Sequence, residues 1–369
     1  MNRRVLPIGQ GNFAIEKFSD FTAVFDCGSK TDITLVHDEI DRNFYDGERI
    51  DAVFVSHLDY DHINGIDYLI GKCSVKCIVI PYLHHETMLI RYLYDSLFKT
   101  STRNSSFLNS IYNSLLEHQG QIVRYENIRV VQIPVFETDS NEVSSADIHD
   151  KYYNLVMGAM TEINDMNPDW LFLPFNFDAK NRSELFYQAL ASDPELSSLS
   201  IYDLAKNWDN PDFKYVEKLK KIFRSKKITG SLNDNSMVVY SGPIIRRYNE
   251  LYFVNDSLFN KTNCGSFKNE IGAIYMGDYS AHKKSYYNEF LKYYDRYIGY
   301  VGLIVIPHHG SKNGYNESLP IDFDGVFLIS YGSAYAYSCD HTVLKDLLAK
   351  GRRIILVDEK SAVFEQIIL

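Results

Sequence analysis

The sequence predicts an α/β protein in which functional side chains follow short buried strands, with a large, mostly helical insertion. Three observations support this fold class. Three apolar runs have the length of strands, and each is followed within a few residues by Asp or His: Ala52–Val55, Ala273–Met276 and Gly302–Pro307. Residues 84–229 instead show helical spacing of apolar side chains. Because a rigid sheet aims the loops at its strand ends, α/β proteins place their chemistry in such loops.

Short strands separated by turns are expected in the first 83 residues. They are Arg4–Leu6, Asn12–Glu16, Ala23–Phe25, Ala52–Val55 and Cys77–Ile80. A helix is expected from Asn64 to about Gly71, directly after a loop rich in His and Asp.

Residues 84–229 change in character and are expected to form a mostly helical cap over the site. Six segments have helical patterns: Glu86–Lys99, Leu108–His118, Tyr152–Ile163, Ser183–Ala191, Ile201–Trp208 and Tyr215–Phe223. One strand is expected at Ile128–Val135. Chain entropy tolerates a long insertion if it folds on itself between two segments that must meet. His84 and His85, at its start, either reach the site or lie on the surface.

Residues 230–369 return to strands. Helices are expected at about Tyr286–Tyr294 and His341–Ala349. The last two apolar runs, Ile354–Val357 and Val363–Ile368, are expected to close the fold as a pair of strands.

The loop after Ala52–Val55 carries four metal-ligand side chains within six residues: His57, Asp59, Asp61 and His62. The simpler interpretation is a turn in which Asp61 caps the following helix. Later strand ends argue against it, because Asp278 follows one strand and His308 and His309 follow the next. Repetition of this pattern at three strand ends favours a site for two metal ions.

These motifs resemble those of metallo-β-lactamase-fold hydrolases, and more narrowly the hydrolase domain of the ComEC/Rec2 competence proteins. Further similar blocks are Ile8–Asn12, Val24–Gly28, Asn233–Val239, Ile329–Gly332 and Tyr337–His341. The resemblance covers roughly residues 4–83 and 230–369. It implies an αββα sandwich built from residues 1–83 and 230–369, with residues 84–229 as the insertion. Thr342 follows His341 where the family usually has Pro, and the membrane-channel and oligonucleotide-fold parts have no counterpart, so a role in DNA uptake is not implied.

The resemblance also implies the roles of the site residues. The implied ligands are His57 and Asp59 for one ion, Asp61 and His62 for the second, Asp278 between them, and His308 or His309 to complete the coordination. In a two-metal hydrolase the two ions lie about 3.5–4 Å from each other and share an activated water. Asp61 is alternatively a general base. Asp59 stands where typical members have His, which enriches the site in oxygen and favours Mn²⁺, with Zn²⁺ still open.

Three further residues are implied to act on the substrate. His341 occupies the place of a late active-site His, suited to phosphate binding or protonation of a leaving group. Ser311 and Lys312 are expected to contact a substrate phosphate.

The favoured function is a metal-dependent phosphodiesterase or nuclease acting on a nucleic acid or nucleotide. A hydrolase of the same fold acting on a thioester, lactone or other small molecule is the first alternative, because fold alone does not choose the chemistry. The second is a non-catalytic metal-binding subunit of a multi-protein system, such as an antiviral defence module. Proteins that bind long nucleic acids usually have a basic surface, whereas this chain has a net charge of −10. The charge therefore slightly favours small nucleotides as substrates.

Composition predicts the compartment. Five scattered cysteines indicate reduced thiols rather than a disulfide framework, so a cytoplasmic location is expected. No apolar run approaches the length of a membrane span, so no membrane association is expected.

Overall fold

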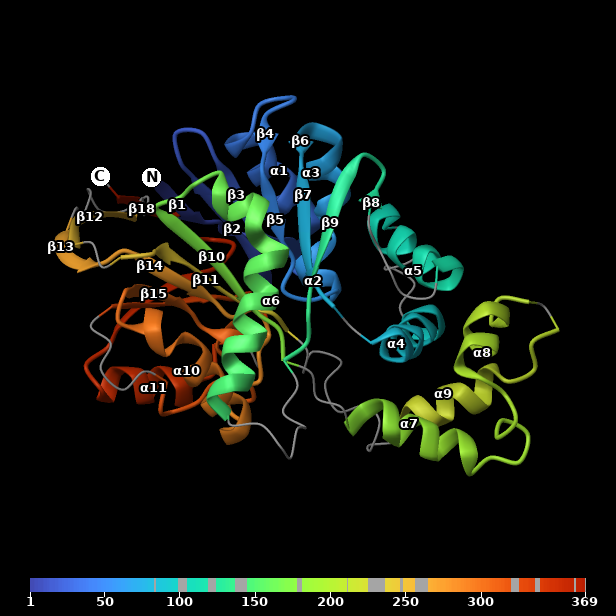
Figure 1. Cartoon of the computed structure of the whole chain (residues 1–369). Coiled ribbons are helices and arrows are strands. Elements are labelled where there is room, and N and C mark those ends of the chain that lie inside the picture. Colours follow the sequence, from blue (N-terminus) through green and yellow to red (C-terminus); the bar gives the residue numbers. More distant parts are fainter. Residues whose placement is uncertain are drawn as a thin grey trace.

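Two β-sheets lie face to face with helices on their outer sides, so this computed structural model has the predicted αββα architecture (Figure 1). The fold class is confirmed. The structure describes residues 1–82, 84–98, 105–118, 124–136, 145–177, 181–210, 212–224, 236–245, 248–255, 265–319, 325–335, 339–361 and 363–368.

The larger sheet has ten strands within the described residues. In chain order they are β1 (Asn2–Val5), β2 (Gly11–Lys17), β3 (Thr22–Ser29), β5 (Ala52–Phe54), β7 (Cys77–Pro81), β8 (Arg124–Tyr125), β9 (Ile128–Ile133), β12 (Tyr248–Asn255), β13 (Gly265–Glu270) and β18 (Phe364–Ile368). Their spatial order is β13-β12-β18-β1-β2-β3-β5-β7-β9-β8. β1 and β18 pair antiparallel with Asn2 opposite Ile367, so both ends of the chain lie side by side (Figure 1). β3, β5, β7 and β9 run parallel.

The smaller sheet has six strands in the same described ranges. They are β10 (Trp170–Phe175), β11 (Val238–Pro243), β14 (Gly272–Tyr275), β15 (Val301–Val305), β16 (Val326–Ser330) and β17 (Arg353–Val357), which is also their spatial order. The last four run parallel, and every residue of β14, β15 and β16 is buried, as expected for parallel strands covered on both faces. Two short strands, β4 (Arg49–Ile50) and β6 (Ser74–Val75), form a separate ladder.

The core between the sheets is rich in aromatic side chains, and helices close the outer faces. Phe25 of β3 stacks on Tyr275 of β14 with ring centroids 3.8 Å apart. The helices α1 (Ile33–Asn43) and α3 (Ile66–Lys72) pack on the larger sheet, and α10 (Lys284–Ile298) and α11 (His341–Ala349) pack on the smaller. α1 begins at Asp32, whose carboxylate accepts a hydrogen bond from the Thr34 amide and so satisfies an otherwise unpaired donor.

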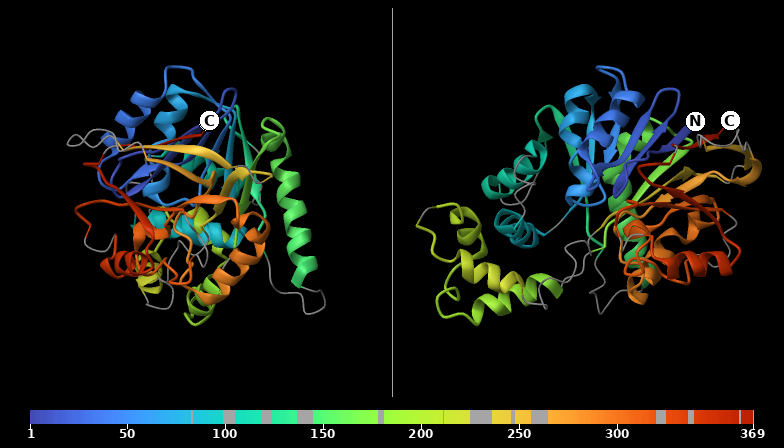
Figure 2. Two further views of the ribbon diagram at one scale, coloured as in Figure 1. Left: turned by 90° about the vertical axis from the view of Figure 1, so that its left-hand side faces the viewer. Right: turned by 180° about the vertical axis from the view of Figure 1, so that it is seen from behind.

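The region 84–229 contributes helices and also parts of both sheets. Its helices are α4 (His85–Phe98), α5 (Ser106–His118), α6 (Ser145–Asp165), α7 (Asn181–Ala191), α8 (Ile201–Asn207) and α9 (Val216–Arg224). β9 extends the larger sheet beside β7, β10 pairs with β11, and α6 packs against both β9 and β10 (Figure 2). We call α4, α5, α7, α8 and α9 the helical insertion. α7, α8 and α9 project away from the sandwich (Figure 1).

One strand was not expected from the sequence, and one expected pairing of strands differs from the structure. The unexpected strand is β10, which contains Pro174; β10 is an edge strand, where Pro is tolerated. The predicted pairing of the last two strands is wrong. β17 pairs with β16 in the smaller sheet, whereas β18 pairs with β1 and β12 in the larger, because the chain crosses between the sheets after Val357.

Within the described residues, no helix combines the length and the apolar character needed to cross a bilayer.

Candidate metal centre

The loop of residues 57–62, which we call the ligand loop, follows β5 and enters a short helix, α2 (Tyr60–Ile63). Asp59 is the N-cap residue, but its side chain makes no capping hydrogen bond. Asp61 and His62 lie within α2, so Asp61 does not serve as the helix cap. All four acidic and imidazole side chains of the loop are buried, which is unusual for charged groups unless they are paired or bind a metal.

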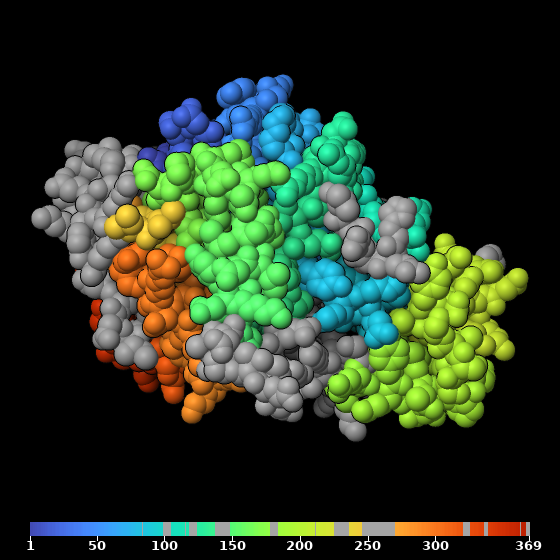
Figure 3. Space-filling view, viewed as in Figure 1, coloured from blue at the N-terminus to red at the C-terminus, as the bar shows by residue number. Residues whose placement is uncertain are grey.

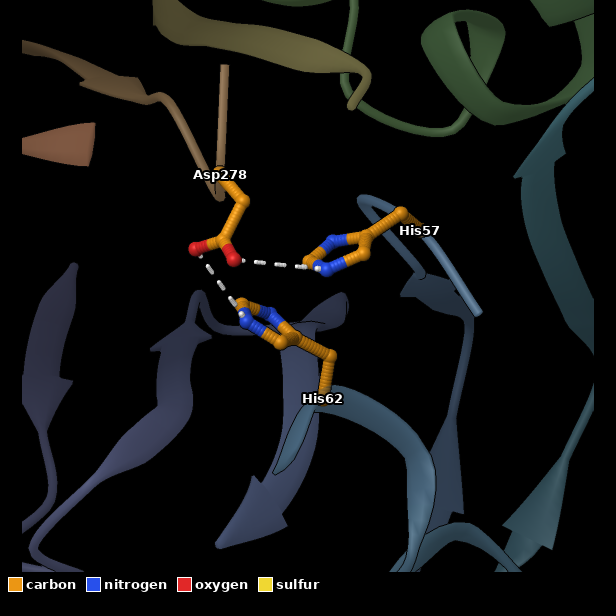
Figure 4. A group of neighbouring side chains, drawn as sticks. All are labelled: His57, His62 and Asp278. Atoms are coloured by element: carbon orange, nitrogen blue, oxygen red, sulfur yellow. Dashed lines mark ion pairs between the residues drawn. The ribbon is translucent and has the colours of Figure 1, made fainter. Parts of the chain in front are cut away.

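Asp278 follows β14 and points its two carboxylate oxygens at two different imidazoles. Its Oδ2 lies 3.6 Å from Nε2 of His57, and its Oδ1 lies 3.5 Å from Nε2 of His62 (Figure 4). The loop from the larger sheet and the strand end from the smaller sheet therefore meet, as the sequence predicted.

Both His308 and His309 enter the centre, from the short 3₁₀ turn η2 (Pro307–Gly310) after β15. Nδ1 of His308 lies 3.3 Å from Oδ2 of Asp278, whereas Nε2 of His309 lies 3.8 Å from Oδ1 of Asp278 and 3.5 Å from Oδ2 of Asp61. Both histidines have φ of +53°, the left-handed region that residues other than glycine rarely adopt. This turn directs two adjacent side chains to opposite oxygens of one carboxylate.

The side chains thus fall into two overlapping sets, which share His62. Nitrogen and oxygen atoms of His57, His62 and Asp278 lie within 4.8 Å of one another, and so do those of Asp61, His62 and His309. Asp59 faces the first set, because its Oδ2 lies 3.8 Å from Nε2 of His57.

Hydrogen bonds behind the centre fix which imidazole nitrogen faces it. Nδ1 of His62 donates to Oδ2 of Asp26 at 2.8 Å, and Nδ1 of His309 donates to the main-chain oxygen of Ser330 at 3.1 Å. The Ser56 hydroxyl donates to Asp26 at 2.8 Å, so it accepts from Nδ1 of His57 at 3.0 Å. All three rings therefore turn Nε2 towards the centre, as is usual for imidazoles that bind a metal.

The residues present fit divalent cations. Nε2 of His57, His62 and His309, and Oδ1 of Asp61, are buried and lack a hydrogen-bond partner within the described part of the chain. Leaving buried polar atoms unsatisfied is costly, and a cation held by several of them would remove that cost.

Two glycines allow these loops to approach closely. A Cβ at Gly28 of β3 would lie 2.7 Å from the amide nitrogen of Ile63 and 2.8 Å from the carbonyl carbon of Asp61, so only glycine lets α2 pack on this strand. Gly277, before Asp278, has φ of +50° and lies against Ser56 and Ser236.

The pKa shifts of His57, Asp278 and Asp61 favour the protonation states that bind cations at neutral pH. Burial lowers the pKa of His57 to about 4, and the charge of His62 acts in the same direction. Burial opposes ionisation of Asp278, yet His308 and His62 hold the pKa of its carboxyl well below the usual value. Burial likewise opposes ionisation of Asp61, but the adjacent imidazole of His309 and the charges of His62 and Lys30 lower its pKa.

His62 behaves differently from His57. Burial disfavours its charged form, but Asp26 and Asp278 raise its pKa well above the usual value. A proton on His62 therefore balances the carboxylates in the metal-free chain, and metal binding would release it.

Two basic residues of the site had no assigned role in the sequence. Lys30, just after β3, places Nζ 2.8 Å from Oδ2 of Asp61, and its side chain is 45% exposed. Arg91, on α4 of the helical insertion, is buried against Asp59. Lys30 follows a block that carries the family resemblance, whereas an arginine within a helical pattern gives no functional signal.

The structure does not gather every predicted site residue. His341 is the first residue of α11; its side chain is 92% exposed and pairs with Asp340 at 3.7 Å. Ser311 is half-buried and Lys312 is exposed, and Lys312 lines an open groove with Lys284 instead of the metal centre. His84 and His85 are half-buried outside the two ligand sets.

A family model and a solved structure are similar to this chain. Residues 12–146 match the family model of the Metallo-beta-lactamase superfamily, a range that includes the ligand loop. Among solved structures, the metallo-beta-lactamase fold protein YhfI from Bacillus subtilis is similar, with 10% sequence identity and a TM-score of 0.37, over 99% of this chain and 100% of that one. No curated protein matches the chain.

Proposed function

We propose that this chain is a metal-dependent phosphodiesterase or nuclease with a centre for two divalent cations. The observation that carries the proposal is the position of Asp278, whose Oδ2 faces His57 and whose Oδ1 faces His62. Within the described residues, the buried Nε2 atoms of His57, His62 and His309 have no hydrogen-bond partner. The ligands would be His57, Asp59, His308 and Asp278 on one side, and Asp61, His62, His309 and Asp278 on the other. Bound ions would supply Lewis acidity and activate water for attack.

The ligand set bears on the identity of the metal. Three carboxylates and four imidazoles make a mixed environment that is richer in oxygen than an all-imidazole site, which suits Mn²⁺ and also accommodates Zn²⁺. Asp59 contributes to this oxygen content, since an imidazole at its position would replace one carboxylate of the ligand set by a nitrogen ligand.

A phosphodiester substrate is supported by two features. The motifs resemble those of the ComEC/Rec2 hydrolase domain, and Lys30, whose side chain is 45% exposed, places its ammonium beside Asp61. Lys30 would bind a non-bridging phosphate oxygen, while Asp61 and Asp278 hold the reacting groups in place. From the same resemblance we further propose that His341, Ser311 and Lys312 act on the substrate; His341 and Lys312 are exposed, and Ser311 is half-buried outside the ligand sets.

The test is a hydrolysis assay with the purified chain and Mn²⁺ or Zn²⁺. The panel contains single-stranded DNA, duplex DNA, RNA, cyclic dinucleotides and a thioester. We expect cleavage of a phosphodiester that is lost in Asp61→Ala and Asp278→Ala and retained in Asp41→Ala, which removes a surface carboxylate paired with Lys72. His341→Ala should lower kcat/KM at least about tenfold with both ions still bound. Thioester turnover with the same dependence on Asp61 and Asp278, or no turnover with metal bound, would overturn the assignment.

A further inference from the structure

Arg91 belongs to the helical insertion but makes its contacts with the ligand loop. Its side chain is 4% exposed. Nη2 donates to the main-chain oxygen of Leu58 at 2.9 Å and also to Oδ1 of Asp59. The loop that carries four of the proposed ligands is therefore held from outside the sandwich by one guanidinium.

The two oxygens of the Asp59 carboxylate have different neighbours. Oδ1 accepts from Arg91, whereas Oδ2 lies 3.8 Å from Nε2 of His57, on the side of the first ligand set. The terminal torsion of an aspartate is broad, so an unrestrained carboxylate would sample many orientations. The contact with Arg91 leaves one defined orientation, with one oxygen facing the centre.

Arg91 is itself held on its other side. Nε lies 3.4 Å from Oδ2 of Asp95, one helical turn further along α4, and Tyr112 of α5 donates to the same oxygen at 2.7 Å. Burial alone would lower the pKa of Arg91, but the charges of Asp59 and Asp95 raise it above its usual value. Removing one partner of such a buried ion pair is strongly destabilising. Contacts to Asp59 on one side and to Asp95 on the other restrict the position of the guanidinium.

The same helix carries apolar contacts to the rest of the insertion. Met88 packs in the cluster on the outer side of the larger sheet, whereas Leu89 and Leu93 pack with Phe186 of α7 and Leu219 of α9. In the space-filling view, α4 fills the surface between the sandwich and these helices (Figure 3). Displacement of the insertion would therefore be transmitted to Arg91.

We propose that Arg91 is a positioning residue for the metal centre: it fixes Asp59 as a one-oxygen ligand and ties the helical insertion to the ligand loop. This inference rests on the metal centre proposed above. It gives the insertion a role in metal binding in addition to any role in selecting substrates.

The test measures metal binding directly, with no substrate present. Full-length wild type, Arg91→Gln, Arg91→Lys and Asp59→Asn are titrated with Mn²⁺ and Zn²⁺ by calorimetry, and bound ions are counted by elemental analysis. We expect two ions in wild type. In Arg91→Gln and Asp59→Asn, one ion should bind as in wild type and the other at least about tenfold more weakly. Arg91→Lys should be intermediate, because an ammonium lacks the planar fork that reaches Asp59 through Nη2 and Asp95 through Nε.

A double variant separates positioning from general destabilisation. If Arg91 acts through Asp59, Arg91→Gln combined with Asp59→Asn should bind the second ion no more weakly than Asp59→Asn alone. Arg3→Gln is the matched control, since Arg3 is also fully buried and paired with Glu16, at 2.6 Å, between the two sheets. It should lower thermal stability and leave both ions bound as in wild type.

The outcomes are distinguishable. Wild type that binds two ions, together with folded Arg91 variants that bind both within twofold of wild-type affinity, would overturn this inference alone. Additive losses in the double variant would also overturn it. Wild type that binds no ion would overturn the proposed function as well. If Arg91→Gln does not fold, the titration of Arg91→Lys decides.

Discussion

Asp26 accepts a hydrogen bond from Nδ1 of His62 at 2.8 Å, with both side chains buried. Asp26 lies in β3 at φ of +52°, a conformation in which a side chain other than glycine is strained. Its carboxylate also accepts the Ser56 amide at 2.7 Å and the Ser56 hydroxyl at 2.8 Å. The carboxylate of this one strained residue thus orients His62 directly and His57 through Ser56.

Asp26→Asn should weaken metal binding. An amide offers one acceptor oxygen where the carboxylate offers two, so it cannot receive all three hydrogen bonds, and the imidazole of His62 loses its defined orientation. We expect affinity to fall by about 10–100-fold, as measured by calorimetry with Mn²⁺ or Zn²⁺. Asp41→Asn, at a surface ion pair, is the control. Unchanged affinity in Asp26→Asn would show that the site holds its ions without this support.

Lys30→Ala should raise KM for a phosphodiester more than it lowers kcat. Its ammonium lies 2.8 Å from Asp61 and its side chain is 45% exposed, so it is placed to meet an incoming phosphate. We expect KM to rise by roughly tenfold at low salt and by less at high salt, because screening weakens an exposed charge. Lys292→Ala, with a 52% exposed side chain on α10, should leave KM unchanged. A fall in kcat with constant KM would instead place Lys30 in the chemical step.

The ligand loop, Asp278 and the His308–His309 pair were predictable because strand exits have a simple sequence pattern. A short apolar run followed by His or Asp is visible without knowledge of the partner strand. The same reasoning could not decide between His308 and His309. Two consecutive left-handed residues place both rings at the centre, and the sequence Pro-His-His-Gly does not specify that turn.

Residues that act through distant partners escaped prediction. Asp26 is 36 positions from His62, and Arg91 is 32 positions from Asp59, so neither pair forms a local motif. Arg91 also lies on a helix whose pattern is dominated by apolar side chains, where an arginine ordinarily indicates a solvated face. The fold class depended on local periodicity, whereas these contacts depend on tertiary packing.

Gly28→Ala should destabilise the protein and weaken metal binding together. The added Cβ would lie within 2.8 Å of main-chain atoms of α2, which carries Asp61 and His62, so the helix must move. We expect a loss of about 1–3 kcal/mol in the free energy of unfolding, measured by chemical denaturation, with a parallel loss of metal affinity. Gly71→Ala is the matched control, because its Cβ would meet open space on α3 and should stabilise the helix by up to about 1 kcal/mol. Full metal affinity in Gly28→Ala would mean that α2 adjusts without moving its ligands.

Alkaline pH should unfold the protein through its buried tyrosines. Tyr152, Tyr293 and Tyr294 donate their hydroxyls to main-chain oxygens of Pro134, Pro174 and Leu173, and burial raises their pKa above the usual value of about 10. Above that pH the unfolded chain has lost these protons while the folded chain keeps them, so the free energy of unfolding falls as pH rises.

Each tyrosine that remains protonated in the folded state contributes up to about 1.4 kcal/mol per pH unit to that fall. Denaturant titrations between pH 9 and 12 should therefore show the free energy of unfolding falling as pH rises. The slope of this free energy against pH should be shallower in Tyr294→Phe, which removes one titrating group and its hydrogen bonds. Tyrosinate absorbance should appear together with loss of structure. Gradual appearance of that absorbance in the folded protein, before unfolding, would show that these hydroxyls are accessible to solvent.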